Sequence, residues 1–101
     1  MPEVAFSRRA ELDLELIDDY TADTWGDAQA DLYLNQLNSF LALLARNPRI
    51  GRVWESSPRN LRRIEHGSHV IFYSQTEQGI LIARILHQNM LPIHHAMDDS
   101  E

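Results

Sequence analysis

The C-terminal third of the chain consists of three short apolar segments separated by turn-forming residues. The segments cover residues 61–65, 69–75 and 80–88, and the stretches between them are compatible with hairpin turns. Strands joined by such short links pair in an antiparallel arrangement. The second and third segments are apolar at consecutive positions, so both faces of their sheet need cover. We therefore expect more apolar sheet surface than the chain itself can cover, which favours a protein that grips a partner.

Two amphipathic helices are predicted before these strands. Ser7 is suited to capping a helix over residues 8–24, which Gly26 ends, and Asp27 is suited to capping a second helix that runs to about Arg46. The apolar positions recur at helical spacing and are Ala10, Leu14, Ile17 and Tyr20 in the first helix and Ala30, Tyr33, Leu37, Phe40, Leu41 and Leu44 in the second. With a short strand over residues 3–7 and a breaker-rich loop over residues 48–60, the order is β-α-α-β-β-β. This order predicts an α+β fold, with a helical hairpin packed on one face of a small, mainly antiparallel sheet.

The length of 101 residues fits one domain, which we place at residues 1–97. Residues 98–101 form an acidic tail that we expect to be disordered. No stretch approaches the ~18 apolar residues of a membrane span, and no secretory signal is visible, so a cytoplasmic location is expected. The chain has no cysteine, which excludes disulfides and thiolate metal sites.

Charge is unevenly distributed along the chain. Residues 1–45 hold two Arg against nine Asp or Glu, a balance of −7, and residues 46–97 hold seven Arg against three acids, a balance of +4. This polarity could steer an acidic partner to one face of the molecule. Alternatively, acidic helices and an arginine-rich sheet neutralise each other within the fold.

Three apolar side chains stand outside the predicted core pattern. Leu32 and Leu43 lie about 140° from the main stripe of the second helix on a helical wheel. They are either isolated exposed leucines or the wall of a groove for a helix of another chain. Trp54, in the loop, is either an anchor for a partner or a lid on a small core.

Three charged residues are candidates for buried or partner-facing contacts. Arg62 and Arg63 alternate across a strand, so one faces each side of the sheet. We expect one of them to pair with the acidic helices and the other to remain available. Asp13 falls inside the apolar arc of the first helix, where pairing with an arginine or capping a backbone group is favoured over a catalytic role.

Five short motifs, in this order, resemble the ParE toxins of the RelE/ParE superfamily. The motifs are Ala10-x-x-Asp13-Leu14-x-x-Ile17-x-x-Tyr20, Trp25-Gly26-x-x-Gln29-Ala30-x-x-Tyr33, Asn47-Pro48-x-x-Gly51-Arg52, the stretch from Arg62-Arg63 to Gly67–Tyr73, and Arg84–Gln88 with Met90. The resemblance covers nearly the whole chain.

The resemblance implies the toxin of a type II toxin–antitoxin module, which inhibits DNA gyrase, and so replication, by binding. It implies a cognate ParD-type antitoxin that wraps the toxin in a hetero-oligomer, by a helix in a groove or by strand addition. Sequence-specific nucleic-acid binding and membrane association are not expected. Because the family's C-terminal region matters for toxicity, Arg84, His87 and Met90 are added to the partner-binding candidates Leu32, Leu43, Trp54, Arg62 and Arg63.

The superfamily also contains ribosome-dependent mRNA endonucleases of RelE and YoeB type. Arg63, Arg84 and His87 could supply part of such a site, with Glu55 or Glu65 as the base. The chain lacks lysine, lacks an aromatic residue near its end and carries a net charge of −6, which suits a ribosome-binding protein poorly. We therefore expect no catalytic residues. A degenerate, non-toxic module that still binds antitoxin is the third reading.

A metal site would have to combine His87, His94, His95 and Asp98. The adjacent histidines diverge on most backbones, and no rigid scaffold holds the tail. We expect no metal and no other cofactor.

Overall fold

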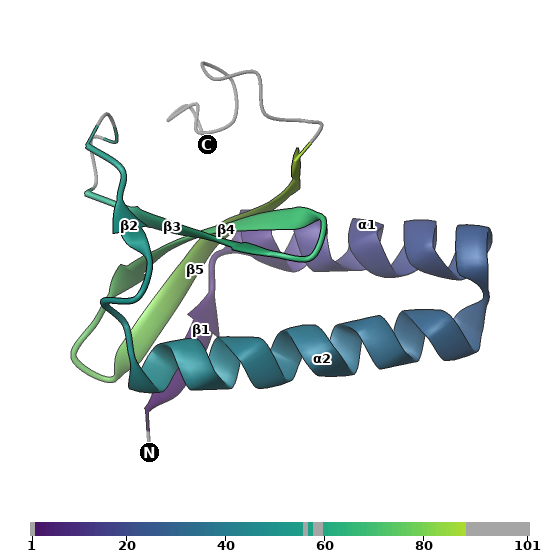
Figure 1. The fold of residues 1–101 in the computed structure, drawn as a ribbon, viewed down its shortest axis with the longest axis horizontal. Helices are drawn as coiled ribbons and strands as arrows, with labels where there is room; N and C mark the ends of the chain where they lie inside the picture. Colours follow the sequence, from purple (N-terminus) through teal and green to yellow (C-terminus); the bar gives the residue numbers. More distant parts are fainter. Residues whose placement is uncertain (1, 56, 58–59, 89–101) are drawn as a thin grey trace.

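The computed structural model describes residues 2–55, 57 and 60–88 and shows two helices packed on a five-stranded sheet. Figure 1 shows the antiparallel helices of the hairpin lying together against the sheet. The elements, in chain order, are β1 (Glu3–Phe6), α1 (Arg8–Trp25), α2 (Asp27–Arg46), β2 (Arg52–Val53), β3 (Arg62–His66), β4 (His69–Gln75) and β5 (Gly79–His87). The predicted α+β class is confirmed.

The strand order is β1-β5-β4-β3-β2, and only the β1–β5 pair is parallel. The prediction of a mainly antiparallel sheet with three C-terminal strands is therefore right. The prediction of a plain loop over residues 48–60 missed β2, a two-residue edge strand whose Arg52 and Val53 pair with Arg63 and Arg62. A strand of this length leaves no periodic signal in the sequence.

The main core lies between the helices and the sheet. Its buried members include Ile17 from α1, Leu37 and Leu41 from α2, and Ile71 and Tyr73 from β4. The predicted stripes supply most of the helical part. Tyr20 is the exception, because 64% of its surface is exposed. The prediction that Tyr20 is a core residue is therefore wrong.

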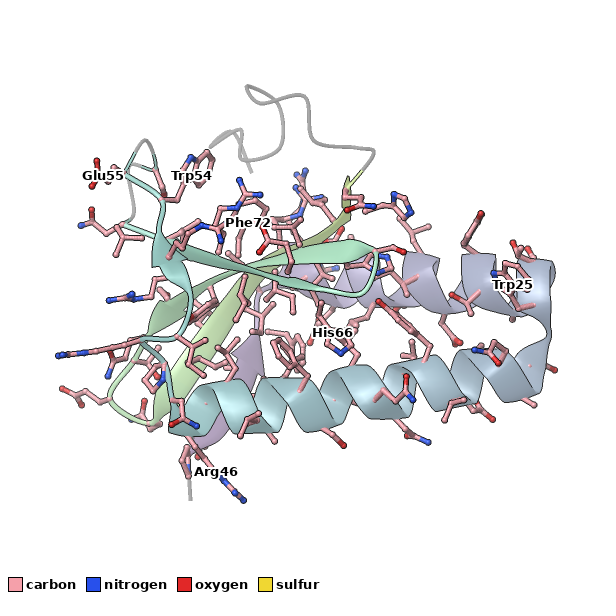
Figure 2. All side chains as sticks on the ribbon, viewed as in Figure 1. Trp25, Arg46, Trp54, Glu55, His66 and Phe72 are labelled. Carbon is pink, nitrogen blue, oxygen red and sulfur yellow. The ribbon has the colours of Figure 1, made fainter. Side chains whose placement is uncertain are left out.

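The opposite face of the sheet has its own small core, made of Leu61, Val70, Phe72, Ala83 and Leu86. All five are buried, with Trp54 packed against them. The expectation of an uncovered apolar face is therefore wrong. Trp54, labelled in Figure 2, packs on this face, which lies opposite the helices.

The two helices begin in different ways. The Ser7 hydroxyl accepts the Ala10 amide N–H at 3.0 Å, as predicted for an N-cap, and donates to the Ala83 carbonyl at 2.8 Å. Helix α2 is preceded by Gly26, at φ 98° and ψ 163°, and has no side-chain cap. Asp27 is the first residue of that helix and not its cap, which corrects the sequence prediction. Only glycine adopts such a backbone conformation readily, so it makes the sharp reversal between the helices.

None of the helices formed by the described residues is long and apolar enough to cross a membrane.

Candidate partner-binding surface

Helix α1 lies against the C-terminal half of β5, at an edge that β1 does not cover. Strand β1 pairs with β5 only from Gly79 to Ile82. The chain then leaves the sheet, with the Ser7 amide bonded to the Ile82 carbonyl at 2.9 Å, and enters α1. This placement brings the outer face of α1 beside the end of β5.

Asp13 fastens α1 to that edge. Its carboxylate accepts the Ile85 backbone N–H at 2.9 Å and two guanidinium N–H groups of Arg84, at 2.8 and 3.1 Å. Asp13 is buried, and three donors compensate its loss of water. The prediction that this carboxylate pairs with an arginine or a backbone group is confirmed, and it does both.

The β4–β5 pairing is irregular next to Arg84. Phe72 pairs with Arg84 and Tyr73 pairs with Ile82, so Ala83 is one extra residue on β5. Ile82 and Ile85 both reach the core beneath the helices, although a regular strand would place them on opposite faces. Such a bulge changes the facing of all later side chains on the strand.

A groove of about 510 Å³ runs between α1 and the end of β5. The lining residues are Asp13, Leu16, Ile17, Tyr20 and Thr21 from α1, His69 from β4, and Arg84, Ile85, Leu86 and His87 from β5. A second hollow, of about 480 Å³, shares Tyr20, Thr21, His69 and His87 with it and extends to Trp25 and Tyr33. The two hollows therefore form one trough along α1.

The floor of this trough carries a histidine–tyrosine cluster. The Tyr33 hydroxyl lies 2.6 Å from Nδ1 of His69, and the rings of His69 and His87 meet edge to face at 5.5 Å. Burial, with smaller contributions from the charges of His87 and His66, lowers the pKa of His69 to about 4. Burial raises the pKa of Tyr33. Neutral His69 can accept a hydrogen bond from the Tyr33 hydroxyl, and this contact joins α2 to the sheet.

Four apolar side chains project outward from α1 around the trough. Their exposed fractions are 49% for Leu12, 66% for Leu16, 64% for Tyr20 and 70% for Trp25. The sequence reasoning did not single out this surface, because it assigned Tyr20 to the core. The signal was present as the four-residue spacing of Leu12, Leu16 and Tyr20 beside acidic positions.

The predicted leucine track of α2 is present but separate from the trough. Leu32 and Leu43 are each 49% exposed. They lie 11 residues apart, which is about 16 Å along a helix. Neither lines the trough.

Trp54 packs on the small core, its ring 5.3 Å from that of Phe72. This contact is the one expected of a lid on a small core, and the role of Trp54 as a partner anchor stays a prediction. Figure 2 shows Trp54 and Phe72 on the same side of the sheet.

Arg62 and Arg63 do face opposite sides of the sheet, but their contacts differ from the expectation. Arg62 donates to the backbone carbonyl of Gly51 at 2.8 Å and of Arg49 at 3.4 Å. Arg63 lies 5.7 Å over the Phe72 ring and 3.3 Å from Glu65. The expected pairing of one of these arginines with the acidic helices is not what these contacts show. Arg84 makes that link instead.

The groups considered for RNA cleavage are divided between separate contacts. Arg63, Phe72 and Arg84 form one row across β3, β4 and β5, so an aromatic ring stands between the two arginines. Glu65 pairs with Arg52 at 2.9 Å. Partial burial acts to raise the pKa of Glu65, but the hydrogen bond and charge of Arg52, a backbone hydrogen bond and the charge of Arg63 lower it below its ordinary value.

Met90 and the tail at residues 98–101 lie outside the described residues, as do His94, His95 and Asp98. Within the described part of the chain, no cluster of three or more His, Asp or Glu could hold a metal ion.

The helical hairpin on a five-stranded sheet defines a class of small α+β fold. A chain from a structure described as the chromosomal ParDE toxin–antitoxin system of P. aeruginosa superposes with a TM-score of 0.69 at 22% identity, covering 86% of this chain and 96% of that one. This likeness shows the RelE/ParE-like fold.

Sequence comparison gives the family. The sequence model for the ParE toxin of the type II toxin–antitoxin system parDE matches residues 4–92, and the chain belongs to this family. Toxin ParE1 of Mycobacterium tuberculosis H37Rv is 41% identical over 85 residues, covering 83% of this chain and 87% of that toxin. Toxin ParE1 of Caulobacter vibrioides is 37% identical over 90 residues, covering 89% and 93%. The chain is a ParE-type toxin, as its motifs indicated.

Proposed function

We propose that this toxin inhibits DNA gyrase by binding to it, and that a cognate ParD-type antitoxin neutralises it by occupying its surface. Membership of the ParE family supports the assignment. The observation that carries it is the trough beside α1, where large apolar side chains are exposed next to a rigid sheet edge. Exposed apolar surface of this kind is typical of protein–protein contact sites.

Binding, rather than catalysis, is favoured by the state of the ionisable groups. The Arg84 guanidinium is held by Asp13, so its charge is already compensated. Glu65 has a lowered pKa and two arginines beside it, which makes it a weak base. His69 is held neutral, with Nδ1 at the Tyr33 hydroxyl. The candidate groups stabilise the fold more plainly than they form a general acid–base pair.

A supercoiling assay with purified toxin and purified gyrase tests the target. We expect loss of supercoiling activity or accumulation of cleaved DNA complexes, both reversed when antitoxin is added first. Full gyrase activity at a large excess of folded toxin would contradict the proposal. Circular dichroism on the same sample shows that the toxin is folded.

Two further measurements separate the alternatives. Primer extension on mRNA from cells expressing the toxin would reveal codon-positioned cuts if the chain were a ribosome-dependent RNase, and we expect none. Induction without antitoxin should arrest growth, and co-expression of antitoxin should restore it. Normal growth in the absence of antitoxin would identify a non-toxic, antitoxin-binding module.

A further inference from the structure

The corner between the end of α2 and the edge strand β2 exposes apolar and cationic side chains together. We call this surface the arginine corner, and its residues are Leu43 and Arg46 from α2, Arg49 and Ile50 from the loop, Val53 from β2 and Arg62 from β3. The three apolar members each have about half of their surface exposed. Leu43 and Arg46 are neighbours on one helical face, because three positions separate them. Figure 2 shows Arg46 at the end of α2, with its side chain pointing away from the sheet.

Strand pairing and hydrogen bonds bring the rest of the corner together. Val53 pairs with Arg62 across β2 and β3, so both side chains lie on the same side of the sheet. The Arg62 guanidinium donates to the carbonyl of Gly51 at 2.8 Å and to that of Arg49 at 3.4 Å. These two bonds join the strand pair to the loop, so the corner is one surface.

The three arginines of the corner have no carboxylate partner within the described part of the chain. The ion pairs found there are those of Arg52 and Arg63 with Glu65 and of Arg84 with Asp13. Arg62 is bound by neutral carbonyl oxygens, which leave its charge uncompensated. Acidic side chains begin beyond Pro48, where Glu3 and Glu77 line a neighbouring hollow. The corner is therefore a bounded patch of positive charge on a chain whose net charge is −6.

The loop that carries Arg49 and Ile50 is fastened to the sheet. The Tyr73 hydroxyl accepts the Gly51 N–H at 2.9 Å and donates to the Pro48 carbonyl at 2.8 Å. A Cβ added at Gly51 would lie 2.5 Å from that hydroxyl oxygen, so glycine is what allows this close approach. A loop that is already ordered loses little conformational entropy on binding, and the corner is in this sense preorganised.

The corner is separate from the trough beside α1. None of its residues lines either hollow of the trough. It has a hollow of its own, of about 470 Å³, which lies between the loop and Gln75 of β4 and is lined by Arg49 and Ile50. The corner is therefore available to a partner that does not depend on the trough.

The mixed character of the corner suits a protein better than DNA. DNA is bound chiefly through its phosphates, which need several cations and gain nothing from exposed isoleucine or valine. Arginine beside apolar side chains is typical of protein–protein interfaces. A complementary protein surface would carry Asp or Glu around exposed apolar residues.

We propose that the arginine corner contacts the gyrase protein itself, at a surface where Asp or Glu side chains surround apolar ones. The inference rests on the proposed function, since it takes gyrase as the target. It adds which part of the toxin meets gyrase and what chemistry the matching gyrase surface has.

The first test measures binding of the toxin to reconstituted gyrase without DNA, at low and high salt. The variant Arg46→Gln/Arg49→Gln should bind about tenfold more weakly at low salt and depend less on salt, because two charges that attract the acidic surface are gone. The control Arg8→Gln/Arg52→Gln removes the same charge from the first turn of α1 and from the other side of β2. It should bind gyrase like the wild type.

The second test truncates the apolar side chains of the corner. The variant Ile50→Ala/Val53→Thr should bind gyrase about tenfold more weakly at both salt concentrations, because salt screens charges and not apolar contacts. Exposed positions tolerate such changes and threonine suits a strand, so the variant should stay folded. Circular dichroism and wild-type affinity for the antitoxin check folding for both corner variants.

Four results would overturn the inference, and only the last also overturns the proposed function. The first is wild-type gyrase binding in both corner variants, or an equal loss of antitoxin affinity in folded ones. The second is a loss seen only when gyrase holds DNA, with Ile50→Ala/Val53→Thr unaffected, which would identify DNA as the partner. The third is low-salt assembly of the free toxin that Arg46→Gln/Arg49→Gln abolishes, which would identify a second copy. The last is failure of the wild-type toxin to bind gyrase at all.

Discussion

Asp13 is the residue through which the helical hairpin and the sheet hold one another. A buried carboxylate is costly in isolation, yet this one has an arginine and a backbone amide as donors. The amide belongs to a strand edge that would otherwise be left unpaired under the helix. One side chain thus satisfies a sheet edge and a partly buried guanidinium together.

Replacing Asp13 should therefore be far more damaging than replacing an exposed acid on the same helix. We expect Asp13→Ala to lower the free energy of unfolding by about 3–5 kcal/mol, because Arg84 and the Ile85 N–H lose their acceptor. Asp13→Asn should cost less, since its amide oxygen can still accept the Ile85 N–H. Urea unfolding at pH 7 measures both, with Glu15→Ala as the exposed control.

The double variant Asp13→Ala/Arg84→Met provides the internal check on this account. Removing the partly buried cation should recover part of the lost stability. Equal losses in Asp13→Ala and Glu15→Ala would show that the buried pair contributes nothing specific.

His69 should make stability depend on pH. Its pKa is about 4 in the folded chain, against 6.5 ordinarily, so the unfolded chain binds the extra proton first. The contribution is fully present above about pH 6.5 and is lost as the pH falls from 6.5 towards 4. Urea midpoints between pH 7.5 and 4 should show the wild type losing stability relative to His69→Gln. Parallel curves for the two proteins would contradict this, whatever His66 and His87 contribute to both.

For single residues, the sequence predicted the type of contact that a side chain makes better than it predicted the partner residue. The place of Asp13 in an apolar arc predicted a paired carboxylate. The partner, Arg84, lies 71 positions away, and its identity depends on how α1 packs against β5 in the folded chain. The contact of Arg62 with the loop carbonyls could not be predicted either, because it depends on the path of the loop.

Among the secondary-structure elements, the starts of the two helices differ most in their energetics. Ser7 caps α1 and also bonds to β5, so it belongs to both layers. Helix α2 instead starts after a glycine whose backbone makes the turn. The sequence offered both Ser7 and Asp27 as caps, since both residue types favour that position. The conformation of Gly26 moved the start by one residue and left Asp27 inside the helix.

We expect Ser7→Ala to lower the free energy of unfolding by about 1–2 kcal/mol, the range for losing an N-cap that also donates a hydrogen bond. Asp27→Ala should change it by less than about 0.5 kcal/mol, through the loss of a favourable helix-dipole contact only. Thermal and urea denaturation of the two variants measure the difference. Comparable losses in both would mean that Asp27 caps α2 after all.

The elements themselves were largely predictable because their apolar periodicities are strong. The predicted central strand agrees with β4 in its bounds, and the predicted second helix differs from α2 by one residue at its start. The cover on the second sheet face was not predictable, because Trp54 lies in a segment with no periodicity and reaches Phe72 only once the loop has folded back. The prediction placed the exposed apolar surface on the sheet, whereas the structure has it on α1.

The whole molecule has two charged regions that remain largely separate. Asp13–Arg84 joins helix to sheet, whereas Arg52 and Arg63 pair with Glu65 within the sheet. On the outer face of α1, exposed Leu12, Leu16 and Tyr20 lie beside an acidic row of Glu15, Asp19 and Asp23. When two copies of the toxin meet through this face, apolar attraction and repulsion between the acidic rows act together.

Salt should decide which of these effects prevails for the free toxin. At 10 mM salt the Debye length is about 30 Å, and at 1 M it is about 3 Å, so repulsion between acidic rows extends far only in dilute salt. We expect sedimentation velocity at pH 7 to show a monomer at low salt and self-association at high salt. The Leu16→Ala/Tyr20→Ala variant should stay monomeric at both, because the apolar attraction is gone. The opposite trend, with assemblies at low salt that dissociate at high salt, would mean that the acidic helices of one copy attract the arginine-rich strands of another.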